Sequence, residues 1–124
     1  MQVYGNSNCD YESNILGDYL KSHLTVNGRN YFESINHNSE YGIWWDWENW
    51  VIGSSLDKGN SSGYGRLNKN SKNPDNQNEW ELYYGDSHGK PIWKKLGRDF
   101  GVKWKGNTFN EIKCHVLILY IFIS

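Results

Sequence analysis

The sequence predicts an all-β fold, a single small antiparallel meander that closes as a barrel or stacks as a sandwich of about seven or eight short strands. Its 124 residues suffice for one hydrophobic core, so residues 1–124 are expected to form one domain. The chain has no alanine but 16 asparagines and 13 glycines, which disfavours helix interiors and favours turns. Aromatic residues make up 16% of the chain, and strand-like alternation replaces helical periodicity throughout.

The first expected hairpin lies in the N-terminal third. A short strand is predicted over Ile15–Leu20. The Asn27-Gly28 pair predicts a tight turn, because both residue types tolerate the positive φ angles that two-residue hairpin loops require. A strand at Tyr31–Ser34 would then complete the hairpin.

A second hairpin is expected over Tyr41–Gly53, with a tight and unusually aromatic connection at residues 47–49. Within it Tyr41, Ile43 and Trp45 share one face of the first strand and should face the core. Alternation places Trp44 on the opposite face, where we expect it to be exposed.

The C-terminal half predicts long loops and further strands. Ser54–Gly65 and Asn68–Asn78 are rich in turn formers and read as loops. A very short strand is expected at Tyr64–Leu67, and a third hairpin over Trp80–Lys94 that turns at Gly85–Gly89. In the strand that follows, the residues expected to face inward are Phe100, Val102 and Trp104, and those expected to face outward are Gly101, Lys103 and Lys105.

The chain ends in an unbroken apolar run of eight residues, Val116–Ile123. A membrane-spanning helix needs about 20 such residues, so no membrane span is predicted. The run suits a strand buried on both faces. A hydrophobic docking tail through which copies assemble, or a non-native extension, are the alternatives.

Charge and cysteine content bound the compartment and the partners. The 13 basic and 14 acidic residues give a net charge of −1, which argues against nucleic acid as a partner. The first residues lack the features of an export signal, which slightly favours a cytoplasmic location. Cys9 and Cys114 are either reduced thiols or a bridge between the terminal strands.

The order of turn and aromatic residues resembles an aromatic-rich β-repeat unit of protist and some animal proteins, often found in tandem. The residues that carry the resemblance are Asn27-Gly28-Arg29, Tyr31, Ile43-Trp44-Trp45, Trp50-Val51-Ile52-Gly53, Tyr64, Pro74 and Trp80. It covers roughly residues 15–104 and implies a scaffold without an assigned activity or ligand, so it supplies no site residues. The sequence departs from the unit in its Trp44–Trp47 tip and in the apolar end after Lys113.

No arrangement of residues predicts catalysis, a metal or a cofactor. Asp46 and Glu48 are the only carboxylates embedded in aromatic residues, but they sit where the chain must turn and are expected to cap that turn. Cys114 and His115 are neighbours on a strand and so point to opposite faces. The four histidines lack the spacing of metal ligands.

A binding surface is the favoured kind of site, because aromatic side chains exceed what a core of this size needs. The candidate ligand-binding residues are Trp44, Asp46, Trp47, Asn49 and Tyr83. Alternatively, these aromatic residues complete a second small core beneath the long loops.

The sequence therefore favours a non-catalytic protein-interaction or architectural β module. A carbohydrate-binding module that uses exposed Trp and Tyr side chains is the alternative, because sugars stack on such rings. A small hydrolase that uses Asp46 or Glu48 is a third hypothesis.

Overall fold

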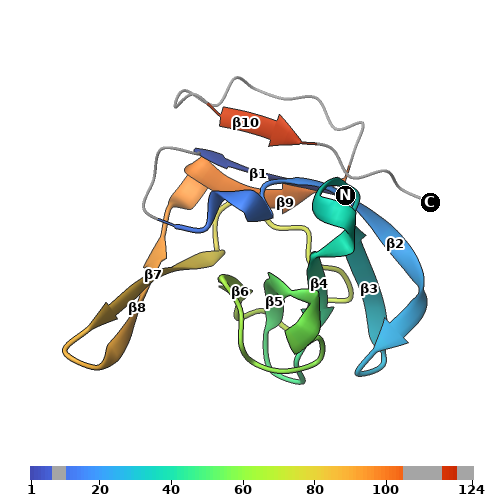
Figure 1. Ribbon diagram of the computed structural model, residues 1–124, viewed down its shortest axis with the longest axis horizontal. Coiled ribbons are helices and arrows are strands. Elements are labelled where there is room, and N and C mark those ends of the chain that lie inside the picture. Colours follow the sequence, from blue (N-terminus) through green and yellow to red (C-terminus); the bar gives the residue numbers. More distant parts are fainter. Residues whose placement is uncertain (7–10, 105–115, 120–124) are drawn as a thin grey trace.

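The computed structural model describes residues 1–6, 11–104 and 116–119, and it confirms the all-β prediction (Figure 1). These residues form one curled antiparallel sheet of ten strands. The strands are β1 (Gln2–Asn6), β2 (Gly17–Val26), β3 (Arg29–Ser34), β4 (Tyr41–Trp45), β5 (Trp50–Ser54), β6 (Gly65–Leu67), β7 (Glu81–Ser87), β8 (Lys90–Lys95), β9 (Phe100–Lys103) and β10 (Val116–Leu119). The helices are four short 3₁₀ turns, Ser13–Ile15, Asn36–Ser39, Ser55–Asp57 and Gly97–Asp99. None of the helices in these ranges has the length and apolar character needed to cross a membrane.

The sheet is a meander in which strands β1 to β8 pair in chain order. Both β9 and β10 pair with β1, which brings the two ends of the described chain together (Figure 1). The N-terminal strand β1 was not predicted from the sequence. Residues 116–119 form β10 and pair with β1, whereas residues 120–123, Cys9, Cys114 and His115 lie outside the described residues.

The predicted hairpins form, and their turns follow the local sequence. Asn27 and Gly28 have φ angles of 52° and 81°, so both occupy the left-handed region expected for this turn. His88 and Gly89 do the same at the end of β7, with φ angles of 51° and 77°. The third hairpin therefore turns over two residues rather than the five predicted, and residues 85–87 belong to β7.

The main core lies on the inner face of the curled sheet, where Ile43 and Trp45 pack as predicted and Tyr41 is partly buried against them. Its fully buried members include Ile15, Trp50, Ile52, Leu67, Trp80, Leu82, Phe100 and Val102. A second, smaller core of Tyr31, Trp44 and Val51 lies on the opposite face of β3, β4 and β5. Both faces of the central strands are therefore covered.

The long loops are tied to the sheet through three fully buried tryptophan side chains. The Nε1 atom of Trp44 donates a hydrogen bond to the backbone oxygen of Asn60 at 2.8 Å. Trp50 Nε1 donates to the backbone oxygen of Ser71 at 2.9 Å, and Trp80 Nε1 donates to that of Pro74 at 3.3 Å. Each hydrogen bond holds a loop that has little regular structure of its own.

The prediction that Lys103 in β9 faces outward into solvent is wrong, because only 5% of its surface is exposed. Phe100 and Val102 are buried as expected, but β9 pairs with β1 and its other face lies against the Tyr4 ring. The Nζ atom of Lys103 lies 5.2 Å from the centroid of that ring. Burial lowers the pKa of Lys103 to about 8, because removal from water disfavours the ammonium form.

Candidate functional site

The β4–β5 turn holds three of the five predicted ligand-binding residues, Asp46, Trp47 and Asn49. Asp46 Oδ1 accepts hydrogen bonds from the backbone nitrogens of Glu48 and Asn49 at 2.9 and 2.5 Å. The Asp46 nitrogen donates to the backbone oxygen of Asn49 at 2.9 Å. This is the turn-capping geometry that the sequence predicted for Asp46, and it uses the carboxylate structurally.

Trp47 occupies the tip of this turn with a φ angle of 81° and 71% of its surface exposed. A bulky residue in the left-handed region costs about 1–2 kcal/mol relative to ordinary backbone. Its exposure agrees with the sequence prediction, and the indole packs into neither hydrophobic core.

The expectation that Trp44 is exposed is wrong, because its side chain is fully buried. Alternation placed it correctly on the face opposite Ile43, but the loop after β5 folds over that face and covers it. A buried indole is not available to a ligand. Trp44 instead fixes the position of Asn60 in that loop.

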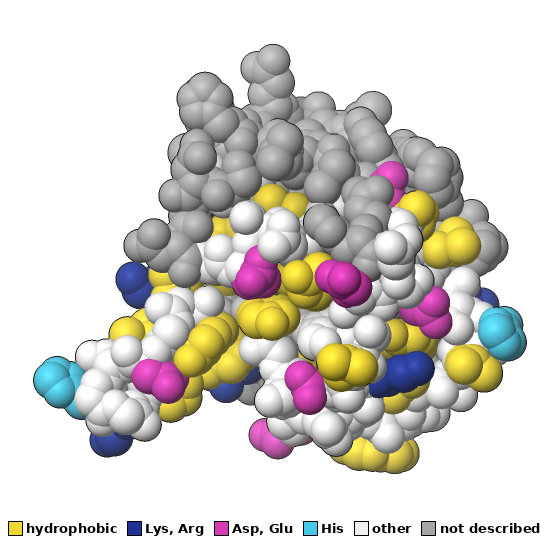
Figure 2. All heavy atoms as spheres, viewed as in Figure 1, with side chains coloured by type: hydrophobic (Ala, Val, Ile, Leu, Met, Phe, Trp, Pro, Cys, Tyr) yellow, Lys and Arg dark blue, Asp and Glu magenta, His cyan; other side chains and the backbone are white. Residues whose placement is uncertain are grey.

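Tyr83 lies apart from the other predicted residues and lines a groove to which none of them contributes. We call this the hairpin groove, because one wall is the β7–β8 hairpin and the other is the loop after β5. It has a volume of about 490 Å³ and is lined by Ser54, Asp57, Ser61, Ser62, Gly63, Tyr64, Tyr83, Asp86, Gly89, Pro91 and Trp93. Figure 2 shows hydrophobic side chains along the hairpin and the recess where it joins the body.

Backbone hydrogen bonds fix the floor of the hairpin groove. The nitrogen of Tyr83 donates to the backbone oxygen of Tyr64 at 2.8 Å, which joins the two walls. The nitrogen of Tyr64 donates in turn to the backbone oxygen of Ile52, also at 2.8 Å. Since Ile52 is a fully buried core residue, both walls are held against the rigid part of the sheet.

A bulge in β7 brings Tyr83 and Asp86 to the same face. The pairing runs from Tyr83 opposite Trp93 to Asp86 opposite Pro91, so β7 contains one more residue than β8 over this stretch. Gly85 lies within the bulge at a φ angle of 95°, a conformation that residues with a Cβ atom rarely adopt. Without the extra residue, alternation would send Asp86 to the face opposite Tyr83.

The rings of Tyr83 and Trp93 form the aromatic wall of the hairpin groove. Their centroids are 5.7 Å apart with an interplanar angle of 55°, and both side chains are half-buried. The Tyr83 hydroxyl donates a hydrogen bond to Asp86 Oδ1 at 2.7 Å. This bond raises the pKa of Tyr83, because it stabilises the protonated phenol beside a carboxylate.

Tyr83 is the lining residue that the sequence prediction included; the other aromatic residues of this site, Trp93 and Tyr64, were missed, as were Asp57 and Asp86. Trp93 could have been identified from strand pairing, because a two-residue turn at His88-Gly89 combined with the bulge sets Trp93 opposite Tyr83. The predicted five-residue turn gave no register from which to derive that pair. Tyr64 is placed by loop contacts that no local pattern indicates.

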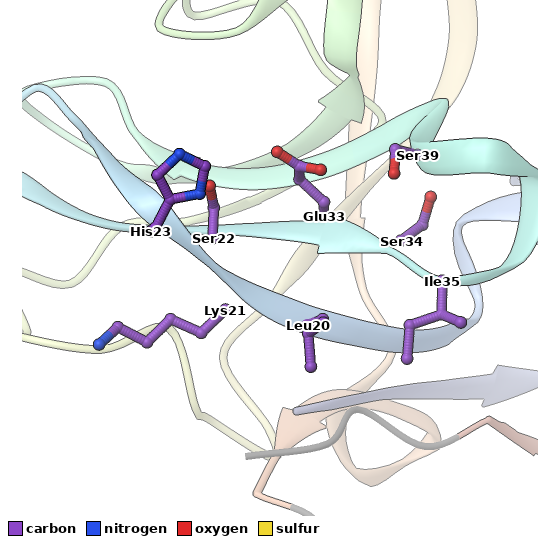
Figure 3. Close-up of a pocket in the computed structure, with 8 residues that line it drawn as sticks. All are labelled: Leu20, Lys21, Ser22, His23, Glu33, Ser34, Ile35 and Ser39. Atoms are coloured by element: carbon purple, nitrogen blue, oxygen red, sulfur yellow. The ribbon is translucent and has the colours of Figure 1, made fainter. Parts of the chain in front are cut away.

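A second depression of about 350 Å³ lies over β2 and β3 (Figure 3). Leu20 and Ile35 point to one side of it, and His23 and Glu33 to the other. Within the described ranges no hydrogen bond joins Ser22, His23 and Glu33, and Ser22 Oγ instead accepts one from the Leu24 nitrogen. The described residues also contain no group of three His, Cys, Asp or Glu side chains that could hold a metal ion.

Comparison of the chain with protein-family models, curated proteins and solved structures finds no match. The resemblance to the aromatic-rich β-repeat unit therefore stays a prediction. The candidate site depends on its own geometry.

Proposed function

We propose that this chain is a non-catalytic protein-interaction module whose binding face is the hairpin groove. The observation that carries the proposal is the half-buried Tyr83–Trp93 ring pair on a wall that backbone hydrogen bonds hold in place. Aromatic side chains in a preformed recess are the usual anchors of protein interfaces, because they bury much area and lose little conformational entropy.

The rim of the hairpin groove favours a polypeptide partner. Leu56, next to the lining residue Asp57, is 94% exposed and is the most exposed large hydrophobic side chain of the described residues. An apolar side chain presented beside an aromatic recess provides a second contact for an extended peptide. Pro91 and Gly89 line the hairpin side of the recess and are both exposed.

Binding requires little rearrangement under this proposal. The Tyr64–Tyr83 backbone bond fixes the floor, and the Trp44–Asn60 bond fixes the loop wall. A preformed site loses less conformational entropy on association than one that must be ordered by its partner. Trp44 thus supports the site from beneath without touching the ligand.

The test is a selection from a random dodecapeptide display library with the full chain as bait. We expect enriched peptides to bind the natural chain and to lose at least tenfold in affinity for a Tyr83→Ala, Trp93→Ala double variant. Trp47→Ala is the matched control, because it also removes an exposed indole but lies outside the groove. Peptides lost with Trp47→Ala but kept by the double variant would place binding at the β4–β5 turn and refute the groove.

Carbohydrate binding is the second candidate, favoured by the chemistry of the same groove. The Tyr83 and Trp93 rings offer surfaces for sugar stacking, and Asp57, Ser61 and Ser62 offer hydrogen-bonding groups for hydroxyls. Titration with chitohexaose, cellohexaose and xylohexaose, followed by tryptophan fluorescence, tests it. A saturable change that Trp93→Ala abolishes, together with an empty peptide selection, would replace the first proposal by this one.

A further inference from the structure

We infer that the hairpin groove binds a basic side chain of its peptide partner, with arginine preferred over lysine. This inference rests on the proposed function and names the chemistry of the ligand. It follows from the charges that line the groove, from where the neighbouring cations are directed, and from the rings available to a guanidinium group.

The ionisable carboxylates of the groove are Asp57 and Asp86, one on each wall, and among the described residues no basic one lines it. Asp86 accepts the Tyr83 hydroxyl through Oδ1. Within the described part of the chain, neither carboxylate forms an ion pair. The recess therefore carries a carboxylate on each wall, and within the described residues neither is neutralised by an ion pair.

Two neighbouring cations lie on aromatic rings, and one of these rings, Trp93, belongs to the groove. Arg66 pairs with Glu81 at 3.5 Å, and its guanidinium lies 4.0 Å from the centroid of the Trp93 ring. Lys94 Nζ lies 4.8 Å from the ring centroid of Tyr84. Since Pro91 and Trp93 face the groove, alternation directs Lys90 and Lys94 to the opposite face of β8 and places Lys95 on the face of Trp93, where it pairs with Glu81 of β7.

The aromatic wall suits a planar cation. Tyr64 and Tyr83 supply rings within one recess beside Trp93, one face of which is already covered by Arg66. Aromatic faces attract cations through their negative quadrupole. The chain already uses this contact elsewhere, because Arg29 stacks on the Trp45 ring with its guanidinium carbon 3.7 Å from the centroid. Arginine is preferred because its guanidinium stacks on rings and donates to a carboxylate in the same plane.

The experiment compares two small probes that differ only in charge, N-acetyl-arginine amide and its neutral isostere N-acetyl-citrulline amide. Each is titrated into isotopically labelled full-length chain, and the shifts of the Trp93 indole and Tyr83 amide signals are followed by NMR. We expect the arginine probe to bind about five to ten times more tightly than the citrulline probe, the product of one cation–ring and one exposed ion-pair contact. The ratio should fall as NaCl rises from 0.05 to 0.5 M.

Asp57→Asn and Asp86→Asn should each reduce the ratio toward one, whereas Glu48→Gln, an exposed carboxylate in the β4–β5 turn, should leave it unchanged. Equal binding of the two probes, or a ratio that survives the double Asp57→Asn, Asp86→Asn change, would overturn the inference. Selected peptides that bind the groove without any Arg or Lys would also overturn it, while leaving the proposed function intact. Failure of the peptide selection with binding of chitohexaose would refute both.

Discussion

Replacement of Trp44 by alanine should lower stability strongly, whereas replacement of the nearby Trp47 should leave it almost unchanged. Trp44 is fully buried and Trp47 is 71% exposed, although they lie three positions apart. Truncation of a buried tryptophan costs about 3–5 kcal/mol through lost contacts and the cavity left behind. The lost hydrogen bond to the Asn60 oxygen adds about 1 kcal/mol, so the free energy of unfolding should fall by about 4–6 kcal/mol.

This loss is large for a chain of 124 residues, whose total stability is expected to be roughly 6–18 kcal/mol. In urea, with a slope of about 1.5 kcal/mol per M, a loss of 4 kcal/mol lowers the unfolding midpoint by about 2.5 M. Trp47→Ala should stay within about 0.5 kcal/mol of the natural chain, because it leaves no cavity.

The assay is equilibrium urea unfolding of the natural chain and the two variants, followed by far-ultraviolet circular dichroism. Equal losses in the two variants, or a loss below about 1 kcal/mol for Trp44→Ala, would refute the assignment of Trp44 to the second core. Trp44→Phe separates the two contributions, because it retains an aromatic ring but removes the donor to Asn60.

Four further perturbations test other parts of the structure. Gly85→Ala should cost about 1–2 kcal/mol in urea unfolding, because the bulge requires a positive φ angle there, and it should weaken peptide binding as Asp86 shifts. Trp47→Gly should raise the free energy of unfolding by up to about 1 kcal/mol, because it relieves a φ angle of 81°; no gain would show that the turn is unstrained. Arg29→Lys should cost about 1–2 kcal/mol in thermal and urea unfolding, because lysine cannot reproduce the stacking and the two loop hydrogen bonds of 2.6 Å. Burial raises the pKa of Tyr4 and Tyr31 from 10.0 to about 12, so between pH 10 and 12 the folded state binds more protons than the unfolded state. The contribution of these two groups to stability should be complete below pH 10 and be lost as the pH rises toward 12. Absorbance titration at 295 nm should find both tyrosines protonated at pH 11 while the chain is folded.

The sequence was sufficient wherever local chemistry decides the structure. The Asn27-Gly28 turn follows from backbone preference alone, and the inward placement of Ile43 and Trp45 follows from strand alternation. Alternation states which residues share a face but not what covers that face. Trp44 was therefore assigned to the correct side of β4 and to the wrong environment.

What could not be predicted depends on contacts between distant segments. Strand β1 pairs with segments as far away along the chain as Leu119, so its place in the sheet does not follow from its own short pattern. Of the candidate site, Tyr83 was identified as a surface aromatic, but its partner Trp93 required the register of the β7–β8 hairpin. That register depends on a bulge at Gly85, and bulges have only a weak sequence signal.

The three indole hydrogen bonds to loop carbonyls have a consequence for how this chain tolerates change. A backbone oxygen is present whatever residue supplies it, so Asn60, Ser71 and Pro74 keep their acceptors when their side chains are replaced. The donors, in contrast, exist only in tryptophan at those positions. In the loop wall of the hairpin groove, the side chain of Asn60 can therefore be replaced without loss of this anchor, whereas Gly63 in the same wall cannot, because an added Cβ atom would clash with Val51.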